Sequence, residues 1–145
     1  MSMTIKEKEQ LKEQLRKLDL EQLGEQFEKY EAFIYELIKE SKEVYKLKEY
    51  DKAEELLDKA YRFLNDELDA IQIIIDEKVD ELYCAKQIEA KETFKWFKRY
   101  MKCCTAIGKT GIKRVIKDID RSQARTERVS ELFGLLFDEN NKLKE

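Results

Sequence analysis

Apolar residues recur along the first third of the chain at steps of three and four, the period of an amphipathic helix. The clearest run predicts a helix over about residues 20–47 and consists of Leu23, Phe27, Tyr30, Ile34, Leu37, Ser41 and Val44. Two start signals accompany it, because Thr4 with Glu7 and Asp19 with Gln22 have the spacing of a capping box. The pattern therefore predicts a short helix from Thr4 and a long one from Asp19.

A second run continues the same period almost without interruption to residue 104. Its members are Leu57, Tyr61, Leu64, Leu68, Ile71, Ile75, Val79 and Leu82, followed by Ala90, Phe94, Phe97, Met101 and Cys104. We expect a helix start near Asp51, which has Glu54 at cap spacing. An unbroken helix over 52–107 would be about 84 Å long, so we expect either an elongated coiled coil or a break at Asn65–Asp66 or 84–90. The apolar positions of 94–104 are expected to face the core.

The four residues Gly108–Gly111 give the clearest turn signal, since Gly108 suits a helix C-terminus. A last helical region is predicted after this turn from Ile112, Ile116 and Ile119, then Val129, Leu132, Phe133 and Leu136. The chain has no proline and only four glycines, which argues against many short strands. We therefore predict an all-α protein, a single domain over 1–145 formed by a bundle of four to five helices, elongated if the central helix is continuous.

The net charge of −3 conceals two segments of opposite sign. Residues 1–85, an acidic helical part, hold 14 Lys/Arg and 23 Asp/Glu, whereas 86–128 hold 13 and 5. Residues 129–145, expected to be a helix end and a frayed tail, hold 2 and 4. Such a division indicates two surfaces with different partners, or the acidic part of one molecule meeting the basic part of another.

Most catalytic and metal-binding chemistry is disfavoured by the residue types present. The chain has no histidine, which removes imidazole bases and ligands. Gly108-Lys109-Thr110 matches the end of a nucleotide-binding loop, but Cys103 stands where that loop needs glycine. Adjacent Cys103 and Cys104 point about 100° apart on a helix, so a shared metal is disfavoured. We expect no enzyme activity, metal or cofactor, although the glycine turn leaves anion contact by backbone N–H groups open.

The segment with Tyr50, Ala53, Leu57, Ala60 and Tyr61 is similar to the second helix of a tetratricopeptide repeat. The resemblance covers about 30 residues, and the positions where that repeat carries tryptophan and glycine hold Leu37 and Ser41. No second copy follows, whereas stable arrays need about three repeats. We interpret the segment as a helical hairpin with alanines at its crossing.

The basic segment gives the sharpest functional signal, because its cations form two stripes at helical spacing. The first consists of Lys91, Lys95, Lys98 and Lys102 with Arg99 beside it; the second, after the expected turn and Lys109, consists of Arg114, Lys117, Arg121, Arg125 and Arg128. A short turn would make the two helices antiparallel neighbours with one positive face. Trp96 and Tyr100 are the candidates for stacking on bases.

We expect this basic helical hairpin to bind nucleic acid, DNA or RNA, without sequence specificity, as a small accessory or regulatory factor. The alternative is a protein-interaction module, such as an inhibitor, adaptor or chaperone-like bundle of the kind that phages and plasmids encode, docking through its acidic helices. A third possibility is that the basic face is solvated or already paired with those helices. We expect no membrane partner. We expect the chain to form a homo-oligomer. The polar N-terminus and the few cysteines indicate a cytoplasmic location.

Overall fold

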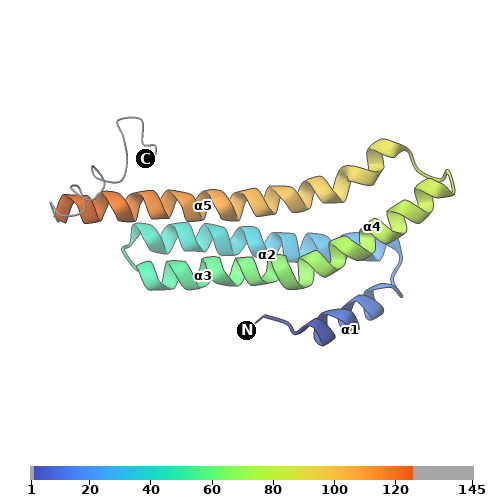
Figure 1. Cartoon of the computed structure of the whole chain (residues 1–145), viewed down its shortest axis with the longest axis horizontal. Helices are drawn as coiled ribbons and strands as arrows, with labels where there is room; N and C mark the ends of the chain where they lie inside the picture. The colour runs from blue at the N-terminus through green and yellow to red at the C-terminus, as the bar shows by residue number, and fades with distance from the viewer. Residues whose placement is uncertain (1, 126–145) are drawn as a thin grey trace, which may run out of the picture. The chain divides into compact units, whose positions relative to one another are not determined.

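The computed structural model describes residues 2–125, and the side chains of residues 2–117. Within them the chain is all-α, as predicted, with no strand. The helices are α1 (Ile5–Leu15), α2 (Leu20–Lys46), α3 (Tyr50–Phe63), α4 (Asp69–Cys84) and α5 (Lys95–Arg125) (Figure 1). A π-helical turn (Leu64–Leu68) joins α3 to α4, and a 3-10 turn (Ala90–Phe94) precedes α5. The chain divides into two compact units, Met1–Lys109 and Thr110–Glu145.

Both predicted capping boxes are present and fix where the first two helices begin. The Thr4 hydroxyl accepts from the Glu7 N–H at 3.1 Å, and the Asp19 carboxylate accepts from the Gln22 N–H at 2.8 Å. Each box satisfies backbone donors that a helix start leaves unpaired. The expected cap at Asp51 is wrong, because α3 begins at Tyr50 after Glu49, which makes no side-chain cap.

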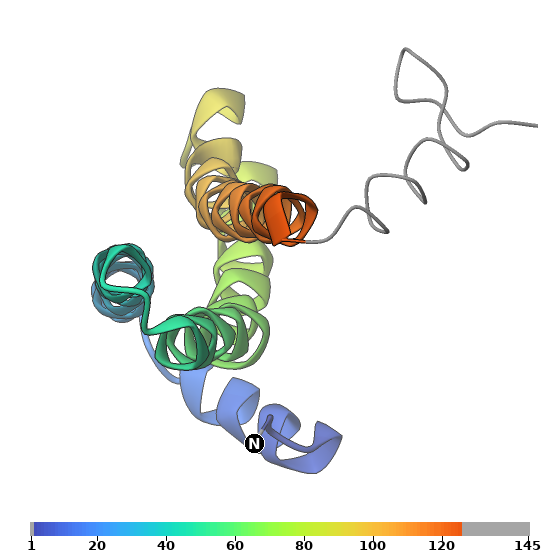
Figure 2. The same ribbon diagram turned by 90° about the vertical axis from the view of Figure 1, so that its left-hand side faces the viewer.

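The predicted helical hairpin is confirmed as α2 and α3, which run side by side (Figure 2). Ala53 and Ala60 are fully buried on α3, and the Ser41 hydroxyl of α2 donates to the Ala53 carbonyl. Small side chains at these positions let the two backbones approach closely. Larger residues such as Phe27 and Ile34 fill the core beside them.

The long apolar run after α3 is interrupted at both of the expected places, in different ways. At Asn65–Asp66 the helix does not end but widens into the π-turn, whose extra residue rotates the buried face that continues through Ile71, Ile75 and Val79. Asp66 lies buried there and accepts from the Met3 N–H at 3.1 Å. Between Cys84 and Ala90 the helix does end, with Lys86 at a positive φ of 59°.

The returning helix α5 packs on α2 through a different face from the one expected. Phe94, Phe97 and Met101 are 57%, 46% and 46% exposed, so their assignment to the core is wrong. The face that packs consists of Trp96, Tyr100, Cys103 and Ile107. Both sets have steps of three and four, so periodicity alone could not separate them. Contacts with α2 decide which set is buried, because the Trp96 ring packs against Gly24, where α2 has no side chain.

The expected turn at Gly108–Gly111 is also wrong, because α5 is helical throughout these residues. Neither Gly108 nor Gly111 has a positive φ. A glycine inside a helix costs only about 1 kcal/mol relative to alanine, which burial of Cys103 and Ile107 on the same helix can offset. The backbone N–H groups are therefore used within the helix, and the anion contact that a new helix start would offer is not formed.

Candidate nucleic-acid interface

Four lysines of the first predicted stripe and its tip lie together on one exposed face of α5. Lys95, Lys98, Lys102 and Lys109 are all exposed, and at 100° per residue they fall within roughly 60° of one another. We call these four side chains the lysine row. Among the described residues, no carboxylate lies within ion-pair distance of Lys98, Lys102 or Lys109. The Lys95 ammonium lies 5.0 Å from the centre of the Trp96 ring.

Acidic side chains are absent from the sequence around this row. No Asp or Glu occurs between Glu92 and Asp118, a stretch that holds eight lysines and arginines. Lys91, just before α5, is exposed but lies 3.3 Å from the Glu89 carboxylate. No acid in the neighbouring sequence therefore offsets the charge of the row, whereas Glu89 partly offsets the charge of Lys91.

Arg99 points toward α2 instead of joining the row. Its Nε lies 3.1 Å from Glu31 Oε2, its Nη2 lies 2.5 Å from Glu31 Oε1, and Glu28 accepts a third bond at 3.4 Å. The guanidinium also stacks 4.8 Å from the Trp96 ring centre and 5.5 Å from that of Phe27. The bonds to Glu31 raise the pKa of Arg99 further above its ordinary value. Arg99 thus fixes the rotation of α5 that presents the lysine row.

The two aromatic candidates for base stacking are engaged with the core. Trp96 meets Phe27 edge to face at 5.1 Å, and the Tyr100 hydroxyl donates to Asp69 Oδ1 at 3.4 Å. Burial raises the pKa of Tyr100 and keeps its hydroxyl protonated. Both side chains are half-buried and pack against the core.

The second predicted stripe falls mostly beyond the described side chains. Arg114 is half-buried and Lys117 is exposed in the unit Thr110–Glu145. Arg121 and Arg125 belong to α5 by their backbone alone, and Arg128 lies outside the described residues, as do the predicted C-terminal helix and tail. Because the turn is absent, the antiparallel hairpin that would join the two stripes is not formed.

Two of the three cysteines, Cys103 and Cys104, lie on α5 with thiols removed from solvent to different degrees. Cys103 is fully buried, and burial raises the pKa of its thiol to about 11, so the reactive thiolate is not populated near neutral pH. Burial also raises the pKa of the half-buried Cys104. The described part of the chain contains no cluster of three Cys, Asp or Glu side chains that could hold a metal ion.

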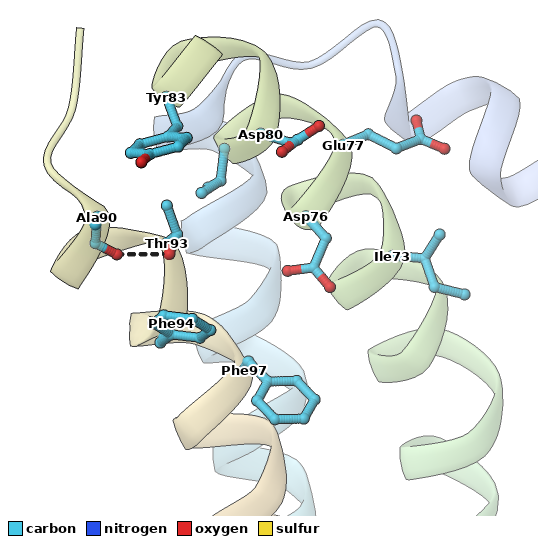
Figure 3. A pocket seen from close by; sticks show the side chains of 10 residues that line it. Ile73, Asp76, Glu77, Asp80, Tyr83, Ala90, Thr93, Phe94 and Phe97 are labelled. Atoms are coloured by element: carbon cyan, nitrogen blue, oxygen red, sulfur yellow. Dashed lines mark hydrogen bonds between the residues drawn. The ribbon is translucent and has the colours of Figure 1, made fainter. Parts of the chain in front are cut away.

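Sequence reasoning missed an open groove between α4 and the start of α5. Its volume is about 730 Å³, and it is lined by Ile73, Asp76, Glu77, Val79, Asp80, Tyr83, Ala90, Thr93, Phe94 and Phe97 (Figure 3). The aromatic residues of this lining were assigned to the core or left unassigned, which hid the groove. A usable signal was the pair Asp76 and Asp80, two acids four residues apart on one helix face.

No protein-family model, curated protein or solved structure shows a significant match to the chain. The helices of the described part are too short or too polar to cross a membrane.

Removing the Arg99 guanidinium should destabilise the fold without touching the lysine row. We expect Arg99→Met, which keeps most of the apolar stem, to lower the free energy of unfolding by about 2 kcal/mol, the usual loss for charge-assisted bonds. Lys102→Met, on the same helix but without an ion pair, should change it by less than about 0.5 kcal/mol. Urea unfolding followed by circular dichroism measures both; equal stability of the two variants would contradict the role assigned to Arg99.

Proposed function

We propose that the protein is a non-enzymatic accessory factor that binds the phosphate backbone of nucleic acid through the lysine row. The observation that carries the proposal is the exposure of four lysines on one face of α5 with no acid in the surrounding sequence. Phosphate binding by lysines is driven by the release of condensed counterions and requires no base contact. Binding should therefore show little sequence preference.

The dimensions of the row suit several successive phosphates. Lys95 and Lys109 are 14 positions apart in sequence, and at 1.5 Å per residue this corresponds to about 21 Å of helix. Phosphates along one strand of duplex DNA advance about 3.4 Å each, so the row spans about six phosphate steps, and its four lysines can contact three or four of these phosphates. The carboxylates of Glu28 and Glu31 on neighbouring α2 are already paired with Arg99 and do not cancel the field of the row.

The proposal includes a cytoplasmic location and no membrane partner. Three cysteines in 145 residues are too few for a secreted disulfide framework, and the structure leaves all three unpaired. The second candidate function, a protein-interaction module, is favoured by the acidic groove beside α4. None of the residues that line this groove belongs to the lysine row.

The binding proposal is tested by removing charge from the row. Lys95→Gln, Lys102→Gln and Lys109→Gln together should weaken binding to a fluorescent 20-mer, single-stranded or duplex, by about tenfold or more at low salt, because three counterion-releasing contacts are lost. Fluorescence anisotropy gives the affinities. All three residues are exposed, so circular dichroism should show an intact fold.

A matched control lies on α2, where Lys39, Lys42 and Lys46 are also exposed at helical spacing. These lysines alternate with Glu36, Glu40 and Glu43, so their field is neutralised. Their triple change to Gln should leave the affinity within about twofold of wild type. An equal loss in both triples would show that net charge alone, and not the lysine row, attracts the nucleic acid.

A further inference from the structure

Exposed apolar residues at the start of α5 and at the end of the 3-10 turn before it form a seam that the described part of the chain does not cover. Phe94, Phe97 and Met101 follow one another at steps of three and four and are each about half exposed. This spacing is that of the contact positions in a coiled coil. Covering large apolar side chains in such a row with a second surface removes them from water, which lowers the free energy.

The groove between α4 and the start of α5 lies beside this seam. Figure 3 shows the Phe94 and Phe97 rings facing α4 across an open space, with Tyr83 at its far end. The Asp76 carboxylate points into that space, and Gln72 holds it with a hydrogen bond of 3.0 Å. The groove is thus apolar at its floor and acidic on its α4 side.

The two sides of the seam carry opposite charges. On the α4 side, Asp76 and Asp80 have no cation within ion-pair distance among the described residues, whereas Glu77 is already paired with Arg16 at 3.1 Å. On the other side, Lys98 lies roughly 60° around α5 from Met101 and also lacks a described carboxylate partner. The seam is therefore complementary to itself.

We infer that the groove binds a second copy of this chain, with the two copies related by a two-fold axis that runs parallel to α5. Such an axis packs the two seams together and places the Lys98 side of each copy against the Asp76 and Asp80 side of the other. A two-fold axis perpendicular to α5 would instead put lysines beside lysines and acids beside acids. The interface is isologous, so each favourable contact occurs twice.

Charge also argues against the other occupants of such a surface. An anionic membrane would attract Lys98 but repel Asp76 and Asp80 at the same place. The segment 129–145 of the chain itself has a net charge of −2, which does not suit an acidic groove. In contrast, α5 of another copy offers Phe97 and Met101 to the apolar floor and Lys98 to the carboxylates.

The first experiment measures self-association of the full chain by sedimentation equilibrium over about 1–200 μM. We expect a monomer–dimer equilibrium that Phe97→Ser shifts strongly toward monomer. The matched control is Tyr61→Ser, which removes an exposed ring, 55% accessible, from α3 away from the groove, and should leave the equilibrium unchanged. A wild-type chain that stays monomeric throughout this range overturns the inference, as does equal weakening by both variants.

The second experiment tests the direction of the axis by exchanging charges. Asp80→Lys alone places lysine opposite lysine, and Lys98→Glu alone places acid opposite acid, so each variant should be monomeric. Mixed in equal amounts they should form a heterodimer, because both halves of the mixed interface are again attractive. The control is Asp58→Lys, a change at an exposed position of α3, and this variant should dimerise as well as the wild type does.

Two further results would contradict the inference, one from the charge exchange and one from vesicle binding. If each charge variant dimerises as well as wild type, the copies do not meet as described. If the wild-type chain binds vesicles with 30% anionic lipid and Phe97→Ser abolishes that binding without changing self-association, the seam serves a membrane instead. The phosphate test uses Lys95, Lys102 and Lys109 and leaves Lys98 intact, so either proposal can fail without the other.

Discussion

Cys103→Asp should lower the free energy of unfolding by about 3–5 kcal/mol, the largest loss we expect from one substitution on α5. Cys103 is fully buried between α5 and α2, and Arg99, one turn earlier on α5, is already paired with Glu28 and Glu31. The environment that raises the pKa of the thiol to about 11 by burial would equally oppose a carboxylate. An unpaired buried charge typically costs this much.

The comparison is Met101→Asp, two positions earlier on the exposed seam. At a protein concentration low enough to keep the chain monomeric, this change should alter stability by less than about 0.5 kcal/mol. Urea denaturation of both variants separates the two faces of α5. The opposite order, with Met101→Asp the more damaging, would restore the rotation of α5 that the apolar spacing first suggested.

Gly24→Leu should destabilise the protein by about 2–3 kcal/mol, although it replaces a poor helix former with a good one. A Cβ atom at Gly24 would lie 2.9 Å from Trp96 Cη2 and 3.0 Å from Cζ2. The ring cannot easily move away, because Phe27 packs against it and Arg99 covers it. Leucine would have to displace the ring and the ion pair of Arg99 with it.

A double-mutant cycle isolates this cause. Trp96→Phe removes the far end of the ring, which includes the two atoms nearest to Gly24. In that background Gly24→Ala should stabilise the protein by up to about 1 kcal/mol, through helix propensity, whereas in the wild type the contact with Trp96 should cancel the gain. Thermal unfolding of the four proteins measures the coupling, and simple additivity would mean that the close approach has no energetic weight.

Local signals in the sequence predicted the first half of the fold well. The caps at Thr4 and Asp19 and the alanines of the α2–α3 hairpin depend on residues close in sequence or on one helix face. The π-turn at Leu64–Leu68 was foreseen only as a weak point, because its effect is to rotate a helix face and not to end the helix.

The rotation of α5 could not be predicted in the same way. Phe94, Phe97 and Met101 fit helical periodicity as well as Trp96, Tyr100 and Cys103 do. The choice depends on contacts between residues about 70 positions apart: the gap at Gly24 and the carboxylate of Glu31. The same contacts explain why the lysines kept their predicted exposure while Arg99 and the two aromatic candidates turned toward the core.

The salt dependence of binding tests the central claim, phosphate binding by the lysine row, most directly. The logarithm of the association constant for a duplex 20-mer, plotted against the logarithm of NaCl concentration, should fall with a slope between about −2.7 and −3.6 for three to four lysine contacts. The Lys95, Lys102 and Lys109 triple variant should retain a slope no steeper than about −1. No binding at low salt, or a triple variant with the wild-type slope, would contradict the account.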